Sequence, residues 1–480
     1  MEQQTGHFAS PPSSSTADRS LPADPVWLSP VNMALSITPS APGEFVDITN
    51  VLQTCHGATP SWIASLTLVP RHGSHAPSRL PATCLRHSAL ETLPAKTSIP
   101  FPDASSLSPS LPASAAAAAT TAEEAAAAAA AMDFVSRLWK GHRQAFPSAP
   151  KYTEKDVPSL AGKVSRIRRS IPDSSRLSRQ VYIVTGANTG VGKALAKILY
   201  AADAKVYVAT RSSDKASAAI AEIKQEYPSS NGELVFLPLD LADLSTIKGS
   251  VQQFLDKETR LDVLFNNAGV MHPADGSVTA QGYELQLGVN CLGSFLLTKL
   301  LTPVLVATAK TQPEGKVRVV WVASSAAEMP YFSPAGGMPM DNLDYHIPKD
   351  RMTKYAVSKA GNYFHGTEYA RRYKADGIVS VPLNPGNLSS DLWRSQVSVA
   401  RMFLNTFVLH EPKYGAYTEL FAGISDEVTL EKTGSWVVPW GRFESIRPDL
   451  QDAAKTKEEG GTGNAQAFWE WSEEQVKPFI

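Results

Sequence analysis

The chain has 480 residues, of which 43% are hydrophobic and 19% charged, enough apolar material for one large core or two smaller ones. Its 45 basic and 46 acidic residues nearly cancel, to a formal net charge of −1. This balance argues against nucleic acid or an anionic membrane as the main partner and predicts a small, uncharged or modestly charged substrate.

Residues 1–131 are rich in Ser, Pro, Ala and Thr and show neither strand nor helix periodicity. The alanine run at 113–131 could be helical on propensity alone, but it has no apolar stripe with which to dock. We expect this segment to be disordered, or to lie upstream of the true start at Met132. It lacks the basic and apolar regions of a secretory signal, and three cysteines imply no disulfide framework, so a cytoplasmic location is expected.

The folded domain is predicted to span 132–480. It opens on a short amphipathic helix at 132–139, which we expect to pack against the domain rather than lie on a membrane. A basic, almost patternless stretch at 164–180 then intrudes just before the first strand. Val164-Ser165 can be encoded by GTGAGT and Gln180 by CAG, the two ends of a spliced intron. The hypothesis is therefore a retained intron, and the alternative is a genuine basic surface loop.

From Val181 onward, short apolar runs alternate with amphipathic helical patterns, which is typical of a parallel sheet covered by helices on both faces. This pattern predicts an α/β fold with a Rossmann-type, doubly wound, seven-stranded parallel sheet in a single catalytic domain. The predicted strands are Val181–Thr185, Lys205–Thr210, Leu234–Pro238, Leu261–Asn266, Val317–Ala323, Ile378–Leu383 and Trp436–Pro439.

The longest apolar stretch, Leu285–Ala309, has the length of a membrane span. Asn290, Lys299 and Pro303 interrupt it, so we expect a buried helix and no transmembrane segment.

A glycine-rich loop lies between the first strand and the following helix, in the sequence Thr185 to Gly192. Gly186, Gly190 and Gly192 permit a tight turn and let a pyrophosphate approach the outward-pointing amides of a helix amino terminus. The strand before and the helix after make a dinucleotide site more plausible than an ordinary turn.

This loop resembles that of the short-chain dehydrogenase/reductase family, and further motifs follow in the same order. The chain is most similar to the retinol-dehydrogenase-like branch found in filamentous fungi. The motifs are Asn266-Asn267-Ala268-Gly269, Ser324-Ser325, Tyr355-Ala356-Val357-Ser358-Lys359 and Pro385-Gly386. The resemblance implies an oxidoreductase with a nicotinamide cofactor that acts on a carbonyl or an alcohol.

The end of the second strand predicts which cofactor is used. Arg211 follows that strand, Lys215 is nearby, and no acid stands at the strand end. Arg211 could hold a 2′-phosphate bidentately, so we predict NADP(H) rather than NAD(H). The alternative is a solvated surface arginine. By resemblance, Asp240 lies beside the adenine, although it could simply cap the next helix. The predicted cofactor-binding residues are Gly186, Gly190, Val191, Gly192, Arg211, Lys215, Asp240, Asn267, Tyr355, Lys359, Leu388 and Ser390.

Tyr355 and Lys359 are four residues apart and share one face of a helix. A phenol with a pKa near 10 is a poor catalyst at neutral pH, and we expect the ammonium to lower that pKa. The resemblance implies that Ser325 hydrogen-bonds the substrate oxygen, with Ser324 as the structural alternative. It also implies that Asn290 kinks its helix and anchors a proton-relay water near Lys359, although a buried asparagine could be purely structural.

The substrate is expected to be a small, hydrophobic ketone or secondary alcohol, with a role in secondary metabolism suggested by resemblance alone. Residues 329–350 are predicted to fold back over the site. A lid after Leu388 offers apolar side chains that could line a pocket or belong to a core or an interface: Trp393, Met402, Phe403, Leu404 and Phe407. The tryptophan-rich carboxy end should close the domain or contact a second subunit in a homodimer. The alternative function is a catalytically silent NADP(H)-binding regulatory or scaffold protein.

Overall fold

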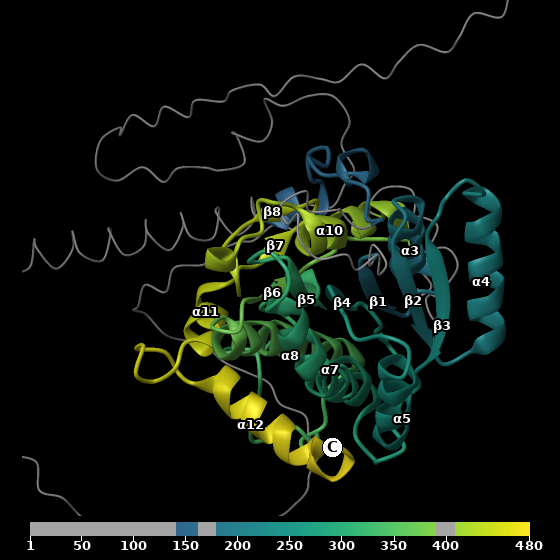
Figure 1. Cartoon of the computed structure of the whole chain (residues 1–480). Coiled ribbons are helices and arrows are strands. Elements are labelled where there is room, and N and C mark those ends of the chain that lie inside the picture. The colour runs from purple at the N-terminus through teal and green to yellow at the C-terminus, as the bar shows by residue number, and fades with distance from the viewer. Residues whose placement is uncertain (1–140, 162–178, 390–408) are drawn as a thin grey trace, which may run out of the picture. The chain divides into compact units, whose positions relative to one another are not determined.

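A computed structural model of the chain describes residues 141–161, 179–389 and 409–480 (Figure 1). The predictions for 1–131, for the helix at 132–139, for most of 164–180, and for Ser390 and the lid side chains lie outside these residues.

One eight-stranded sheet forms the centre of the fold, with the strand order β3-β2-β1-β4-β5-β6-β7-β8. The first seven strands are parallel, as expected of a Rossmann-type sheet. They are β1 (Val181–Thr185), β2 (Lys205–Thr210), β3 (Glu233–Pro238), β4 (Val263–Asn266), β5 (Val317–Val322), β6 (Ile378–Leu383) and β7 (Val437–Val438).

The predicted count of seven strands is one too few, and the sheet is not wholly parallel. An edge strand, β8 (Arg442–Phe443), pairs antiparallel with β7. The two are joined by a tight turn in which Gly441 has a φ of 81°. At two residues, β8 is too short to show the alternation by which a strand is recognised in sequence.

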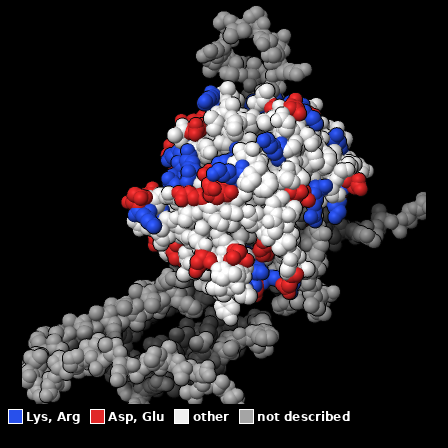
Figure 2. Space-filling model, turned by 90° about the horizontal axis from the view of Figure 1, so that it is seen from below, with Lys and Arg blue, Asp and Glu red and all other residues white. Residues whose placement is uncertain are grey.

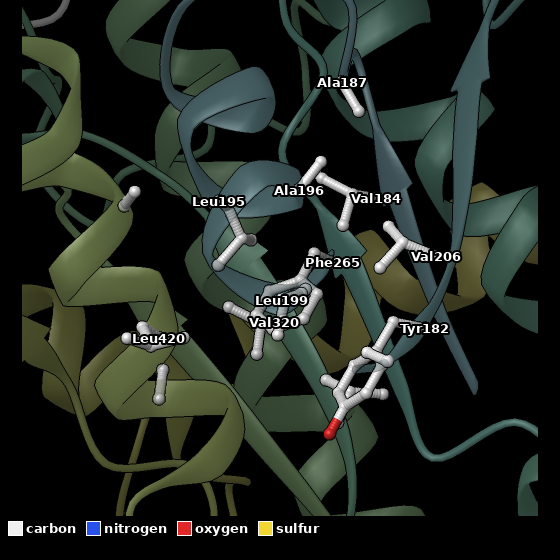
Figure 3. Packing of buried hydrophobic residues seen from close by; sticks show 14 of the residues in the cluster. Tyr182, Val184, Ala187, Leu195, Ala196, Leu199, Val206, Phe265, Val320 and Leu420 are labelled. Atoms are coloured by element: carbon white, nitrogen blue, oxygen red, sulfur yellow. The ribbon is translucent and has the colours of Figure 1, made fainter. Parts of the chain in front are cut away.

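The strands are apolar on both faces because helices cover the sheet on both sides. In β1, Tyr182 and Val184 point into one core cluster, and Val181 and Ile183 into the other. Figure 3 shows the cluster that contains Tyr182 and Val184. There Leu195 and Leu199 of α3 (Gly190–Ala201) pack beside side chains of the sheet. Because successive side chains of a strand point to opposite faces of the sheet, each strand contributes side chains to both cores.

The helices form two layers, which Figure 1 shows above and below the sheet. The cluster containing Tyr182 is built with α3 (Gly190–Ala201), α4 (Ser213–Glu226) and α10 (Pro412–Ile424). The opposite cluster is built with α5 (Leu244–Leu255), α7 (Ser294–Ala309), α8 (Arg351–Tyr373) and α12 (Asn464–Val476).

The long apolar stretch Leu285–Ala309 is one continuous helical segment made of α6 (Leu285–Leu287), the π-helical η2 (Gly288–Gly293) and α7. It has the length and composition of a membrane span, but most of its apolar window is buried within the domain. It serves here as a core helix.

The carboxy-terminal aromatic residues pack within the domain, one of the two expected arrangements. Trp469 of α12 lies edge-on to Phe295, with the ring centroids 4.7 Å apart, and Phe468 stacks on His365 at the same separation. On the face seen in Figure 2, Lys and Arg side chains lie beside Asp and Glu side chains, in keeping with the near-zero net charge.

Candidate active site

The glycine-rich loop connects β1 to α3 at the carboxyl edge of the sheet. Gly186 and Gly190 have φ values of 70° and 56°, a region that side-chain-bearing residues rarely adopt. A Cβ atom on Gly192 would lie 2.5 Å from Asn267 Nδ2 and 2.8 Å from the Gly186 carbonyl oxygen. All three predicted glycines are therefore required by the geometry of the loop, which leads into the amino terminus of α3, the kind of position where a phosphate binds.

Asn267 fastens this loop to the neighbouring strand. Its Nδ2 donates to the Thr185 carbonyl at 2.6 Å, and the Thr185 hydroxyl accepts from the Ala268 amide at 2.8 Å. These contacts give Asn267 a structural role, and its predicted contact with the cofactor stays a prediction.

The predicted selectivity residues follow β2. Arg211 and Lys215 are both exposed, and Lys215 lies in the first turn of α4, which Ser212 caps by accepting from the Lys215 amide at 3.4 Å. Asp240 follows β3, and its carboxylate accepts from the Ala242 amide at 2.9 Å, so it orders its own turn. The N-cap of α5 is Asp243, so the alternative that Asp240 caps the next helix is wrong. The loop, the two cations and this turn line the same sheet edge and fit an extended dinucleotide.

Tyr355 and Lys359 lie on one face of α8 and are both buried. The Lys359 Nζ is 5.8 Å from the centroid of the Tyr355 ring and donates to the Val322 carbonyl at 2.8 Å. The hydrogen bond to Val322, the last residue of β5, fixes the amine beside the phenol.

Burial dominates the acid–base properties of this pair. It raises the pKa of Tyr355 to about 12, against a hydrogen bond with Ser324 that lowers it. Burial also lowers the pKa of Lys359 to about 8, although the Cys291 thiol and the Glu419 carboxyl oppose this shift. Ser324 is the neighbouring side chain that lowers the pKa of Tyr355, and the expectation that Lys359 lowers it as well stays a prediction.

The two adjacent serines have different positions. Ser324 is the N-cap of the short helix η3 (Ser325–Glu328) and accepts from the Ala326 amide at 3.2 Å. Ser325 is the first residue of that helix and is half-buried. Since Ser324 also interacts with the phenol, the choice of Ser325 as the catalytic serine stays a prediction.

Asn290 lies in the π-helical turn η2, and a π-bulge is a common distortion at functional sites. Its side chain accepts from the Val270 amide at 2.8 Å and donates to Ser358 Oγ at 2.9 Å. A Cβ on Gly269 would lie 3.2 Å from Asn290 Oδ1 and 3.3 Å from Lys359 Nζ, so glycine is what allows these two side chains to approach. The structure thus brings Asn290, Lys359 and Tyr355 together.

Sequence reasoning missed two polar partners on α8. The Asn362 Nδ2 donates to the Asn290 carbonyl at 2.6 Å, and Ser358 accepts from the Asn290 side chain. Ser358 follows Tyr355 by three residues and Asn362 follows it by seven. These helical spacings place both residues on the same buried face of α8 as Tyr355, and the sequence could have revealed this.

Leu388 packs in the core rather than projecting into open space. A Cβ on Gly415 of α10 would lie 2.3 Å from Leu388 Cδ1 and 3.1 Å from Val191 Cγ2. Leu388 also forms a parallel bridge with His410, so the chain on either side of 390–408 is joined beside the site.

The inserted loop at residues 329–350, which follows η3, contacts the site near its beginning. Phe332, with Met271 and Met352, packs against Tyr355 and Ala326. Further along the same loop, Met338, Leu343 and Tyr345 belong to a core cluster with α8, α11 (Pro448–Ala454) and α12. The prediction that 329–350 folds back over the site therefore holds for the beginning of the loop, and the rest is anchored by the carboxy-terminal helices.

Comparison with known proteins agrees with this geometry. The family model described as short chain dehydrogenase matches residues 180–335. A short-chain dehydrogenase/reductase of Phomopsis amygdali is 55% identical over 341 residues, which cover 70% of this chain and 96% of the relative.

Two further fungal relatives extend the match. The short-chain dehydrogenase/reductase bet4 of Neocamarosporium betae is 45% identical, over 72% of this chain and 94% of the relative. The short-chain dehydrogenase/reductase sthC of Phaeosphaeria nodorum is 46% identical, over 61% and 88%. The fold and the site define a Rossmann-type oxidoreductase, and the chain belongs to the short-chain dehydrogenase/reductase family.

Proposed function

We propose that this protein is an NADP(H)-dependent oxidoreductase that interconverts a carbonyl and an alcohol on a small hydrophobic substrate. The observation that carries the proposal is the position of Lys359, which lies beside the Tyr355 ring and approaches Asn290 at Gly269. In this proposal the three side chains serve as proton donor, cation and polar anchor at the carboxyl edge of the sheet, where ligands of such folds bind.

The side chains handle the proton, and a bound nicotinamide supplies or accepts the hydride. In reduction, the Tyr355 hydroxyl donates its proton to the carbonyl oxygen as the carbon gains a hydride, while Ser325 holds that oxygen by a hydrogen bond. In oxidation, the Tyr355 phenolate takes the alcohol proton. Lys359 favours the phenolate because its ammonium lies beside the ring, and Asn290 and Asn362 order the polar chain behind it.

The preference for NADP(H) rests on Arg211 and Lys215. Both cations are exposed at the end of β2 and the first turn of α4, where a 2′-phosphate would lie. A guanidinium can bind that phosphate through two parallel hydrogen bonds, and the lysine adds a second positive charge.

The preference for a hydrophobic substrate is supported by the surroundings of Tyr355. Met271, Phe332 and Met352 are partly buried side chains that offer apolar surface next to the phenol. A cytoplasmic location and a role in secondary metabolism belong to the same proposal. The buried free thiol of Cys291 suits a reducing compartment, and the metabolic role rests on the resemblance to fungal family members.

The test is NADPH consumption by the full chain with a panel of aromatic and aliphatic ketones. We expect Tyr355→Phe to lower kcat by about 100-fold or more without abolishing NADPH binding. Tyr373→Phe, at the far end of the same helix, is the matched control and should turn over like wild type. Equal rates for Tyr355→Phe and wild type would overturn the mechanism. NADPH binding without turnover of any ketone would instead support the catalytically silent alternative.

A further inference from the structure

A side chain of the segment before the first strand contacts two loops that flank the active site. Gln144 lies in the helical residues 141–145, outside the region that the family model matches, yet only 8% of its surface is exposed. We propose that Gln144 is a positioning residue that ties the turn carrying Ser325 to the loop after β6. The inference rests on the proposed function, because it concerns the same site.

Gln144 uses both ends of its amide. Its Nε2 donates to Glu328 Oε1 at 3.1 Å, and its Oε1 accepts from Asn384 Nδ2 at 2.9 Å. Because Glu328 offers an acceptor on one side and Asn384 offers a donor on the other, the orientation of the amide is determined. A residue of the same shape without polar atoms could make neither bond.

The two partners belong to the two segments that the chemistry needs. Glu328 is the last residue of η3, whose first residue is Ser325. Asn384 directly follows β6, and its Oδ1 accepts from the Gly386 amide at 3.0 Å, in the loop that leads to Leu388. The serine turn and the Pro385-Gly386 loop therefore share one hydrogen-bonded chain through Gln144.

Each end of this chain has an additional attachment. Trp436 Nε1 donates to Glu328 Oε1 at 2.8 Å, which links the serine turn to the residue before β7. His410 Nε2 lies 3.2 Å from the Ala145 carbonyl, next to the Leu388–His410 bridge. Buried polar groups that lose a partner are costly to leave unpaired, so the network should hold both segments in one arrangement.

The segment itself has other anchors that do not involve Gln144. Arg442 donates to the Ser148 and Ala149 carbonyls, both at 2.9 Å, and Arg143 pairs with Glu444 at 3.1 Å. Replacing Gln144 should therefore break the network without detaching the segment. Arg143→Ala removes an ion pair one residue away, in which the arginine side chain is 55% exposed and the glutamate 15%, and is the matched control.

The experiment compares full-length wild type, Gln144→Met and Arg143→Ala by ketone reduction at saturating NADPH and by amide hydrogen exchange. We expect Gln144→Met to lower kcat about tenfold and raise the Kd for NADPH about threefold, because both the serine and the cofactor loop lose their fixed positions. Amide exchange should accelerate in residues 325–329 and 384–389 and stay at wild-type rates in β1 and α3. Arg143→Ala should match wild type in every measurement.

A folded Gln144→Met protein with unchanged kcat and unchanged exchange in those two segments would overturn the inference. Faster exchange spread over the whole sheet would overturn it as well, since that outcome marks a general loss of stability. If wild type reduces no ketone, the proposed function fails, and the exchange measurement still decides whether Gln144 ties the two segments.

Discussion

The amide nitrogen of Gln180 donates a hydrogen bond to the carbonyl oxygen of Leu160 at 3.1 Å, although residues 161–179 separate them in sequence. Gln180 continues directly into β1, and its own carbonyl accepts from the Lys205 amide at 3.0 Å. The described residues on the two sides of 162–178 are therefore joined by a hydrogen bond. That 164–180 is an insertion into the domain stays a prediction.

Deleting residues 164–180 should leave a folded protein. The deletion joins Lys163 to Val181, so that Leu160-Ala161-Gly162-Lys163 can form a four-residue turn with glycine in its third position, as a type II turn requires. The Lys163 amide would then replace that of Gln180. We expect an equal or higher thermal midpoint and unchanged NADPH affinity by fluorescence titration. An insoluble product would show that the inserted residues are part of the fold, and sequencing the transcript would show whether they are translated.

The roles of Ser324 and Ser325 can be distinguished by the pH dependence of the rate as well as by its size. Ser325→Ala should lower kcat about 100-fold at every pH, because a hydrogen bond to the reacting oxygen is lost. Ser324→Ala removes the hydrogen bond that lowers the pKa of Tyr355. That pKa should then rise, and the pH–rate curve for alcohol oxidation, which needs the phenolate, should move to higher pH. The roles are reversed if Ser324→Ala gives the larger, pH-independent loss.

Gly269 tests the approach of Asn290 to Lys359. In Gly269→Ala the new methyl group would press on Asn290 Oδ1 and Lys359 Nζ, which must each yield by a few tenths of an ångström. We expect kcat to fall about tenfold while the free energy of unfolding changes by less than ~1 kcal/mol. Gly249→Ala, where a Cβ meets nothing within 4 Å, is the control for adding a methyl group. Full activity in Gly269→Ala would mean that this approach is not needed for turnover.

Arg211→Asp should reverse the preference for the cofactor. An acid at the end of β2 would repel a 2′-phosphate and accept a hydrogen bond from a free 2′-hydroxyl. We expect the KM for NADPH to rise at least about tenfold and that for NADH to fall. Steady-state kinetics with both cofactors provides the measurement, with Lys224→Asp at the other end of α4 as control. Equal use of NADH and NADPH by wild type would contradict the assignment.

Glu419 should make the stability of the domain depend on pH. It is fully buried on α10, neither carboxyl oxygen has a hydrogen-bond partner among the described residues, and burial raises its pKa to about 8. A raised pKa means that the folded state holds the proton more tightly than the unfolded chain. The resulting stability is complete below the pKa of about 4.5 in the unfolded chain and is lost as the pH rises through about 8.

Glu419→Gln keeps the shape of the side chain and removes its titration. Urea unfolding between pH 5 and about 9 should show a steeper decline in wild type than in the variant, by at most ~5 kcal/mol over the range. If the free energies of unfolding of wild type and variant decline in parallel, the Glu419 carboxyl has the same charge in the folded and the unfolded protein over this pH range.

The sequence by itself determined the order of the elements, the family and the pair of residues that we propose as catalytic. Continuous apolar runs identified β1, β2, β4, β5 and β6 because these strands are buried on both faces. The spacing of Tyr355 and Lys359 needed only the geometry of one helix. The glycines at 186, 190 and 192 were readable for a similar local reason, since their backbone angles and close contacts exclude a side chain.

Only the tertiary structure decided the surroundings of these residues. The contacts of Gln144 with Glu328 and Asn384 join segments far apart in the chain, and no periodicity signals them. The pKa of Tyr355 depends on how completely the fold removes the phenol from water, and the spacing of Tyr355 and Lys359 in the sequence does not reveal that burial. Burial and long-range hydrogen bonding are properties of the packed chain, so they appear only when its distant parts are brought together.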